Sequence, residues 1–124
     1  MDKVLVDTSV LIDFLRVKNK EGTLFASLVK EEKQLYISII THTELYAGKS
    51  IWEDKKAKEE LEILFSGLSL LPLEEGISQK AGEIKASYNL NLLDAIIAAT
   101  ALIHYLKLVT LNIKDFRKVE GLKL

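Results

Sequence analysis

The chain has no cysteine, one proline and only two histidines among its 124 residues, and these shortages narrow the chemistry open to it. Without cysteine it forms neither disulfides nor zinc–thiolate sites. His42 and His104 fall in different predicted helices, so a histidine pair for general acid–base chemistry is not expected. No apolar run reaches the roughly 18 residues of a membrane span and no signal peptide fits, so we expect a soluble, cytoplasmic protein without a membrane partner.

The sequence does contain enough apolar side chains for a core. Hydrophobic residues make up 48% of the chain, and there are no repeats, low-complexity tracts or proline- and glycine-rich linkers. We therefore expect residues 1–124 to form a single domain. The net charge of −1 argues against a strongly basic surface for nucleic acid, but leaves a local basic patch open.

Short apolar segments alternate with longer amphipathic ones along the chain. The pattern predicts strands at 3–6, 35–38, 68–71 and 108–110, and a short edge strand at 121–124. It predicts helices at 9–16, 21–32, 41–49, 52–66, 75–88 and 92–105. Strands that alternate with helices indicate a parallel sheet covered on both faces. The expected fold is therefore α/β, a three-layer α/β/α sandwich with four or five parallel strands.

Four acidic residues are expected to meet at one edge of this sheet. Asp7 closes the first predicted strand, and Asp115 follows the fourth. Glu44 lies in the first predicted turn after the second strand, and Asp94 lies in the first turn of the helix that leads into the fourth. In open α/β sheets, ligands bind at the carboxyl ends of the strands. All four side chains belong to that edge, whatever the order of the strands.

Helix capping is the simpler explanation for each acid taken alone. Thr41-x-x-Glu44 matches a capping box, Asn91-x-x-Asp94 and Asn112-x-x-Asp115 are close relatives of it, and Asp7 could cap the helix that follows. Capping does not explain why the four acids meet, because two carboxylates ~4 Å apart repel by about 4 kcal/mol at an effective dielectric near 20. Such a cluster needs a bound cation or several protonated members. All-oxygen ligation favours Mg²⁺ or Mn²⁺.

Four segments carry a family resemblance: VLVDTSVLI at 4–12, TEL at 43–45, LDAIIAATA at 93–101 and LVTLNIKDF at 108–116. In order and spacing the chain resembles PIN-domain nucleases, most closely the VapC toxins of type II toxin–antitoxin pairs. The resemblance implies a PIN-like fold and a Mg²⁺-dependent (or Mn²⁺-dependent) endoribonuclease that hydrolyses RNA phosphodiester bonds. It also implies that the metal-holding, catalytic residues are Asp7, Glu44, Asp94 and Asp115.

The same resemblance suggests supporting roles around these acids. Thr8 or Ser9 would support the first acid, and Thr110 and Asn112 would shape the rim. The position of the last acid varies in the family, so Asn112 and Asp115 can share or exchange its role.

The resemblance also implies partners. Arg16 and Lys49 are candidates to bind RNA, because the helices that carry them start at the acidic edge. A cognate, VapB-like antitoxin would place a helix in an apolar groove, and a homodimer is expected. The helices carry more apolar residues than a small sheet buries, namely Leu11, Leu15, Leu24, Phe25, Leu28, Leu45 and Tyr46. Two alternatives remain, a housekeeping RNA-processing PIN nuclease and a catalytically inactive PIN domain that binds RNA or protein.

Overall fold

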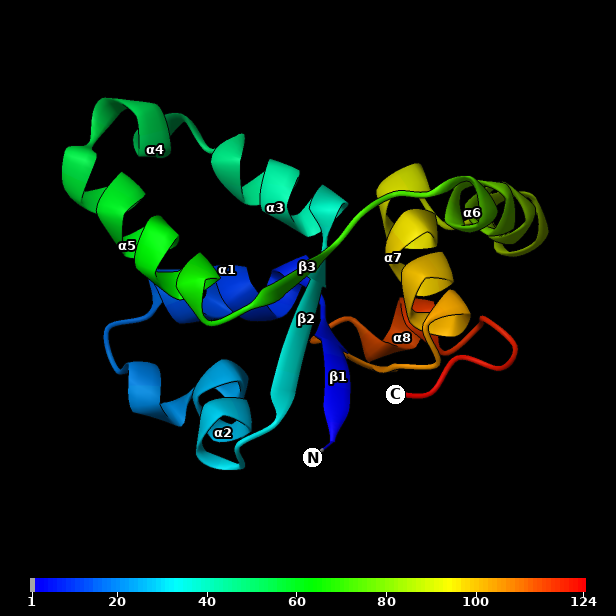
Figure 1. Cartoon of the computed structure of the whole chain (residues 1–124), viewed down its shortest axis with the longest axis horizontal. Coiled ribbons are helices and arrows are strands. Elements are labelled where there is room, and N and C mark those ends of the chain that lie inside the picture. Colours follow the sequence, from blue (N-terminus) through cyan, green and yellow to red (C-terminus); the bar gives the residue numbers. More distant parts are fainter. Residues whose placement is uncertain (1) are drawn as a thin grey trace.

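Four parallel strands form the centre of the computed structural model, which describes residues 2–124 (Figure 1). They are β1 (Lys3–Val6), β2 (Gln34–Ser38), β3 (Ser69–Leu71) and β4 (Lys107–Val109), in the order β3-β2-β1-β4. Every neighbouring pair is parallel. β1 therefore lies between β2 and β4, as the predicted parallel sheet requires.

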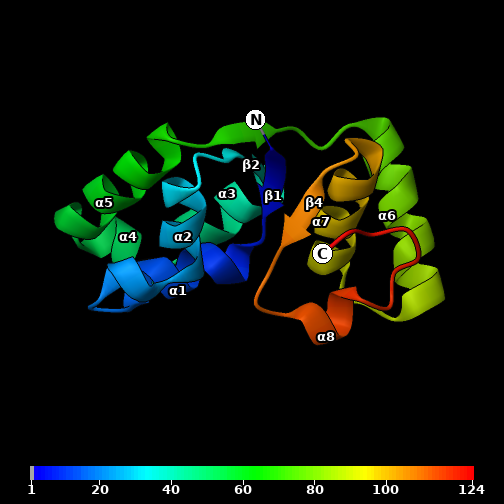
Figure 2. The same cartoon turned by 90° about the horizontal axis from the view of Figure 1, so that it is seen from below.

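Helices cover both faces of the sheet (Figures 1 and 2). Leu5 and Leu108 point to the face covered by α6 (Glu75–Tyr88) and α7 (Leu92–Ile103). Val4 and Val6 point to the opposite face, covered by α1 (Thr8–Arg16), α2 (Leu24–Lys30) and α5 (Lys55–Ser66). This alternation divides the core into two apolar clusters, one on each side of the sheet. The three-layer α/β/α prediction is confirmed.

The remaining elements are short. They are the 3₁₀ turn η1 (Lys20–Gly22), α3 (Ile39–Tyr46), α4 (Lys49–Glu53) and α8 (Ile113–Phe116). No helix within residues 2–124 has both the length and the apolar character to cross a bilayer.

Several predicted boundaries are wrong. The helix predicted at 52–66 is divided into α4 and α5, because the side chain of Asp54 accepts the N–H of Lys56 at 3.0 Å and starts a new helix. The helix predicted at 21–32 starts only at Leu24, where Thr23 caps it. Residues 121–124 form no strand. One backbone hydrogen bond, from Leu108 N to Lys123 O at 2.8 Å, ties that segment to β4.

Candidate metal centre

Asp7 lies where β1 and β4 end side by side. Its backbone N–H donates to Val109 O at 2.9 Å, and its side chain is only 4% exposed. Its Oδ2 accepts hydrogen bonds from Ser9 Oγ and Thr110 Oγ1, both at 2.7 Å. Asp7 occupies the N-cap position of α1 but makes no side-chain cap hydrogen bond. The capping explanation for Asp7 is therefore wrong, and its carboxylate is held by two hydroxyl groups.

Those two hydroxyl groups are themselves fixed by the backbone that follows β4. The N–H of Leu111 donates to Ser9 Oγ at 3.2 Å, and the N–H of Asn112 donates to Thr110 Oγ1 at 2.9 Å. The hydrogen of each hydroxyl is thus left for Asp7. The structure places Ser9 and Thr110 as supports of the first acid.

Glu44 reaches the site from the second turn of α3, not from the first turn as predicted. Ser38 caps this helix, because its side chain accepts the N–H of Ile40 at 3.1 Å. Thr41 is therefore no cap, and the predicted capping box is wrong. Thr8 Oγ1 donates to Glu44 Oε1 at 2.8 Å. Thr8 supports the second acid rather than the first.

Asp94 and Asp115 are each held by an asparagine three residues earlier. Asn91 caps α7 by accepting the N–H of Asp94 at 2.9 Å, and its Nδ2 donates to Asp94 Oδ2 at 2.9 Å. Asn112 Nδ2 donates to Asp115 Oδ2 at 3.0 Å, but the Asn112 side chain caps no N–H of α8. The capping prediction is confirmed for Asn91 alone.

The charges of the other three acids act on Asp94. Burial raises the pKa of Asp94 above its ordinary value, and the negative charges of Asp7, Glu44 and Asp115 raise it further. The hydrogen bond from Asn91 partly opposes this rise. Within residues 2–124, however, no three acidic or histidine side chains already stand close enough together to hold one ion.

Each of the four carboxylates has one oxygen held by a neighbouring side chain. The held oxygens are Asp7 Oδ2, Glu44 Oε1, Asp94 Oδ2 and Asp115 Oδ2. No side-chain or backbone donor within residues 2–124 makes a hydrogen bond to the second oxygen of any of them, although Lys118 Nζ lies 4.0 Å from Asp115 Oδ1. Four single oxygens without a sulfur ligand suit a hard cation such as Mg²⁺ or Mn²⁺. The chemistry of this donor set suits the predicted metal, but within residues 2–124 the acids do not stand close enough together to hold one ion.

Comparison with known proteins agrees with this geometry. The model of the PIN domain family matches residues 4–122. The chain belongs to the PIN domain family. Ribonuclease VapC10 of Mycobacterium tuberculosis (strain CDC 1551 / Oshkosh) is 32% identical to it over 127 residues, which cover 97% of this chain and 90% of that protein. The predicted resemblance to VapC proteins is thus confirmed.

Solved structures share the fold of this PIN domain over almost its whole length. A toxin–antitoxin complex from Klebsiella pneumoniae has a chain that matches with a TM-score of 0.76 and 30% identity, over 98% of this chain and 96% of the other. The structure of DNA-bound VapBC from Salmonella typhimurium matches with a TM-score of 0.83 and 25% identity, over 99% and 96% of the two chains.

Of the two predicted RNA-binding residues, only Arg16 shares a groove with one of the four acids, Glu44. Arg16 and Glu44 line one groove of about 290 Å³ between α1 and the α3–α5 segment. Lys49 is 87% exposed, and its Nζ lies 3.8 Å from Glu53 Oε1. Lys49 does not line this groove.

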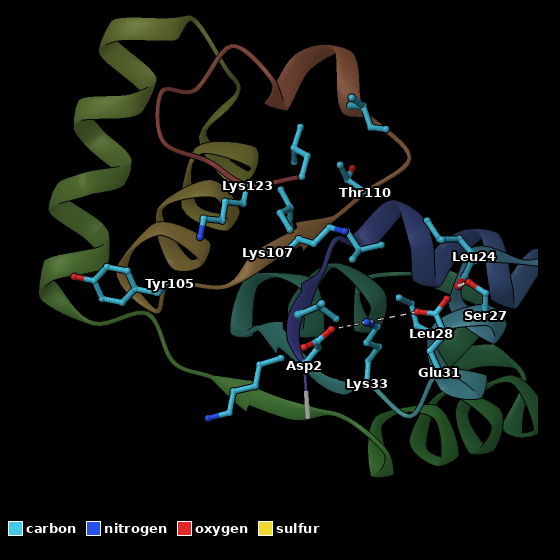
Figure 3. Close-up of a pocket in the computed structure, with 16 residues that line it drawn as sticks. Asp2, Leu24, Ser27, Leu28, Glu31, Lys33, Tyr105, Lys107, Thr110 and Lys123 are labelled. Atoms are coloured by element: carbon cyan, nitrogen blue, oxygen red, sulfur yellow. Dashed lines mark hydrogen bonds and ion pairs between the residues drawn. The ribbon is translucent and has the colours of Figure 1, made fainter.

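A second hollow of about 520 Å³ opens beside the amino end of β1 and along β4 (Figure 3). Thr110 lines it, but none of the four acids does. Lys33 also lines it, with Nζ 2.8 Å from Asp2 Oδ2 and 3.6 Å from Glu31 Oε2. This hollow is therefore separate from the acidic cluster of the PIN domain.

A third, mostly apolar groove of about 560 Å³ lies between α1, α2 and α5. Val29 and Ile63, which are 52% and 72% exposed, stand on its rim, and Phe14 lines its wall. Two of the apolar residues predicted to exceed the core, Leu15 and Phe25, line this groove. Three others, Leu11, Leu28 and Leu45, are buried in the core of this PIN domain and do not line it.

Proposed function

We propose that this PIN domain is a Mg²⁺-dependent endoribonuclease and the toxin of a type II toxin–antitoxin pair. The observation that supports the proposal is that the charges of Asp7, Glu44 and Asp115 all act on Asp94, and that each of the four acids has one oxygen held by a neighbouring donor. The ribonuclease named among its relatives supports RNA as the substrate. Two toxin–antitoxin complexes among the similar structures support the toxin role.

Asp7, Glu44 and Asp94 would hold the cation, with Asp115 beside them. A bound Mg²⁺ would polarise the scissile phosphate and lower the pKa of an attacking water. The protein contributes orientation, because hydroxyl and amide donors fix one oxygen of each acid and leave the other for the cation. Arg16 would bind a neighbouring RNA phosphate, since it lies in the same groove as Glu44.

The apolar groove between α1, α2 and α5 would receive an antitoxin helix. Its exposed residues Val29 and Ile63 suit the apolar face of an amphipathic helix. A basic antitoxin side chain could then pair with the carboxylates in place of the metal, so that inhibition and Mg²⁺ binding compete. A homodimer remains a further expectation, to be measured by light scattering.

Growth experiments test the toxin role. Expression of the wild type should arrest growth, and expression of Asp7→Asn should not. In a toxin–antitoxin pair a short neighbouring gene is expected to encode the antitoxin, and its co-expression should restore growth. Purified protein should cleave RNA with Mg²⁺ and lose this activity with a chelator. Harmless expression of a protein that cleaves RNA in vitro would indicate a housekeeping RNA-processing nuclease. A soluble protein that neither cleaves RNA nor gains thermal stability from Mn²⁺ would be an inactive binding module.

A further inference from the structure

The hydroxyl oxygen of Thr8 lies within hydrogen-bonding distance of two other side-chain oxygen atoms. Its Oγ1 is 2.9 Å from Thr41 Oγ1 and 2.8 Å from Glu44 Oε1. Thr41 is fully buried and Thr8 is 6% exposed. The two threonines therefore form a buried link between α1, which starts at the sheet edge, and α3, which carries the acid.

The number of hydrogens decides the direction of this link. A threonine hydroxyl has one hydrogen to donate, and Glu44 must be ionised to bind a cation and then has none. The hydrogen of Thr8 therefore goes to Glu44, and the contact between the two threonines uses the hydrogen of Thr41. The order of donation is Thr41 to Thr8 to Glu44.

Thr41 also departs from the usual behaviour of a helical threonine. The hydroxyls of Thr43 and Thr100 donate to the carbonyl four residues earlier, Ile39 O at 2.9 Å and Ile96 O at 2.7 Å. Thr41 makes no such bond, and Thr8 is its one hydrogen-bond partner within residues 2–124. Its hydroxyl is thus committed to the acidic site rather than to its own helix.

We propose that Thr41 is a positioning residue, which directs the Thr8 hydroxyl to Glu44 Oε1 and so turns Glu44 Oε2 toward the cation. The proposal rests on the proposed function, because it assumes that Glu44 binds metal. Without Thr41, the hydroxyl of Thr8 loses the donor that fixes its rotation, and the orientation of Glu44 becomes less defined.

Calorimetric titration of the purified protein with Mn²⁺ tests this role apart from catalysis. Thr8→Val should weaken Mn²⁺ binding by about 10- to 100-fold, as is typical for a direct partner of a metal ligand. Thr41→Val, one step further from the metal, should weaken it by about 3- to 10-fold. Thr41→Ser should restore wild-type affinity, because it keeps the hydroxyl.

Thr100→Val is the matched control. It removes a buried hydroxyl from another helix, where the partner is a backbone carbonyl, so the melting temperature should fall as in Thr41→Val while Mn²⁺ affinity stays unchanged. In the Thr8→Val background, Thr41→Val should cause no further loss of affinity, since the link is already broken. Additive losses, or equal affinities for Thr41→Val and Thr100→Val, would overturn the proposal.

A wild-type protein that binds no Mn²⁺ would overturn the proposed metal site and this inference with it, whereas wild-type binding unaffected by Thr41→Val would overturn the inference alone. If Thr41→Val does not fold, NMR of the wild type decides. A slowly exchanging Thr41 hydroxyl proton with a nuclear Overhauser effect to Thr8 supports the link. A Thr41 hydroxyl proton that exchanges rapidly with water contradicts it.

Discussion

Asn91 holds Asp94 with both ends of its amide group, since its Oδ1 accepts the N–H of Asp94 and its Nδ2 donates to Asp94 Oδ2, each at 2.9 Å. The first bond starts α7, and the second fixes the carboxylate. Asn112 makes only the second kind of bond, to Asp115. Helix capping and the orientation of an acid are therefore compatible at Asp94, where one asparagine does both.

Asp7→Asn should abolish RNA cleavage and leave the fold intact. The new amide oxygen can still accept the hydroxyls of Ser9 and Thr110, while the amide nitrogen replaces the free oxygen meant for the metal. We expect a loss of activity of about 100-fold or more. Mutation of a residue that only supports a metal ligand already lowers metal affinity or activity by about 10- to 100-fold. Asp54→Asn is a control that should cleave normally, since it keeps a distant helix cap. Wild-type activity in purified Asp7→Asn would place the chemistry elsewhere.

Asp94→Asn should stabilise the metal-free protein at neutral pH. The pKa of Asp94 is raised in the folded state by burial and by Asp7, from an ordinary value of 3.8. Between that value and the raised pKa the folded state binds more protons, so stability falls as pH rises through this window. The variant removes this penalty. Its melting temperature should exceed that of the wild type by a few degrees at pH 7, and the advantage should disappear as the pH falls toward 4.

Added Mn²⁺ should reverse the order of these melting temperatures, because the wild type gains the binding energy and Asp94→Asn does not. Thermal melts with and without the ion, from pH 4 to 8, give all the comparisons. A metal-free Asp94→Asn protein that melts well below the wild type at pH 7 would mean that the carboxylate serves α7 rather than a cation.

Thr110→Val should weaken both the fold and the metal site. It removes one of the two donors to the buried Asp7 carboxylate and the acceptor of the Asn112 N–H. We expect a loss of about 1–3 kcal/mol in the free energy of unfolding, as for other hydrogen bonds to buried charged groups. Denaturant melts and Mn²⁺ titration measure the two effects. Thr110→Ser should behave as the wild type, and a Thr110→Val protein with unchanged Mn²⁺ affinity would disprove the support of Asp7.

Ile63→Asp and Val29→Asp should weaken antitoxin binding without changing RNA cleavage. Both residues are exposed on the rim of the apolar groove, away from the acids. A charge introduced beside an apolar helix seated in this groove should reduce affinity by about tenfold or more. Ile103→Asp, on an exposed site of α7 that does not line the groove, is the control for binding measured by calorimetry. Equal affinities for all three variants would place the antitoxin elsewhere.

The sequence predicted best those elements whose pattern is local. The amphipathic segment at 75–88 matches α6 residue for residue, and the buried strand before Asp7 is β1. The predicted helix boundaries between residues 39 and 54 are wrong. Ser38 both ends β2 and caps α3, so no turn residues mark the start of that helix. At Asp54 the helical pattern continues across a real break.

The sequence predicted which acids should meet, but it did not predict the hydrogen bonds around them. Topology alone placed Asp7 and Asp94 at one edge, because parallel strands share their carboxyl ends. The partner of Thr8 was assigned from its neighbour in the sequence, whereas the structure pairs it with Glu44, 36 residues away. Hydroxyl partners of this kind depend on helix docking, which no local pattern encodes.

The hydrogen bonds from Thr110 Oγ1 to the Asp7 carboxylate and from Asp7 N to Val109 O have a consequence for protein synthesis. Asp7 is translated before one of its two donors and before the neighbouring strand, which both follow it about a hundred residues later. A growing chain therefore cannot complete its own acidic centre. If the proposed nuclease activity needs this centre, the protein would be inactive until synthesis has passed β4.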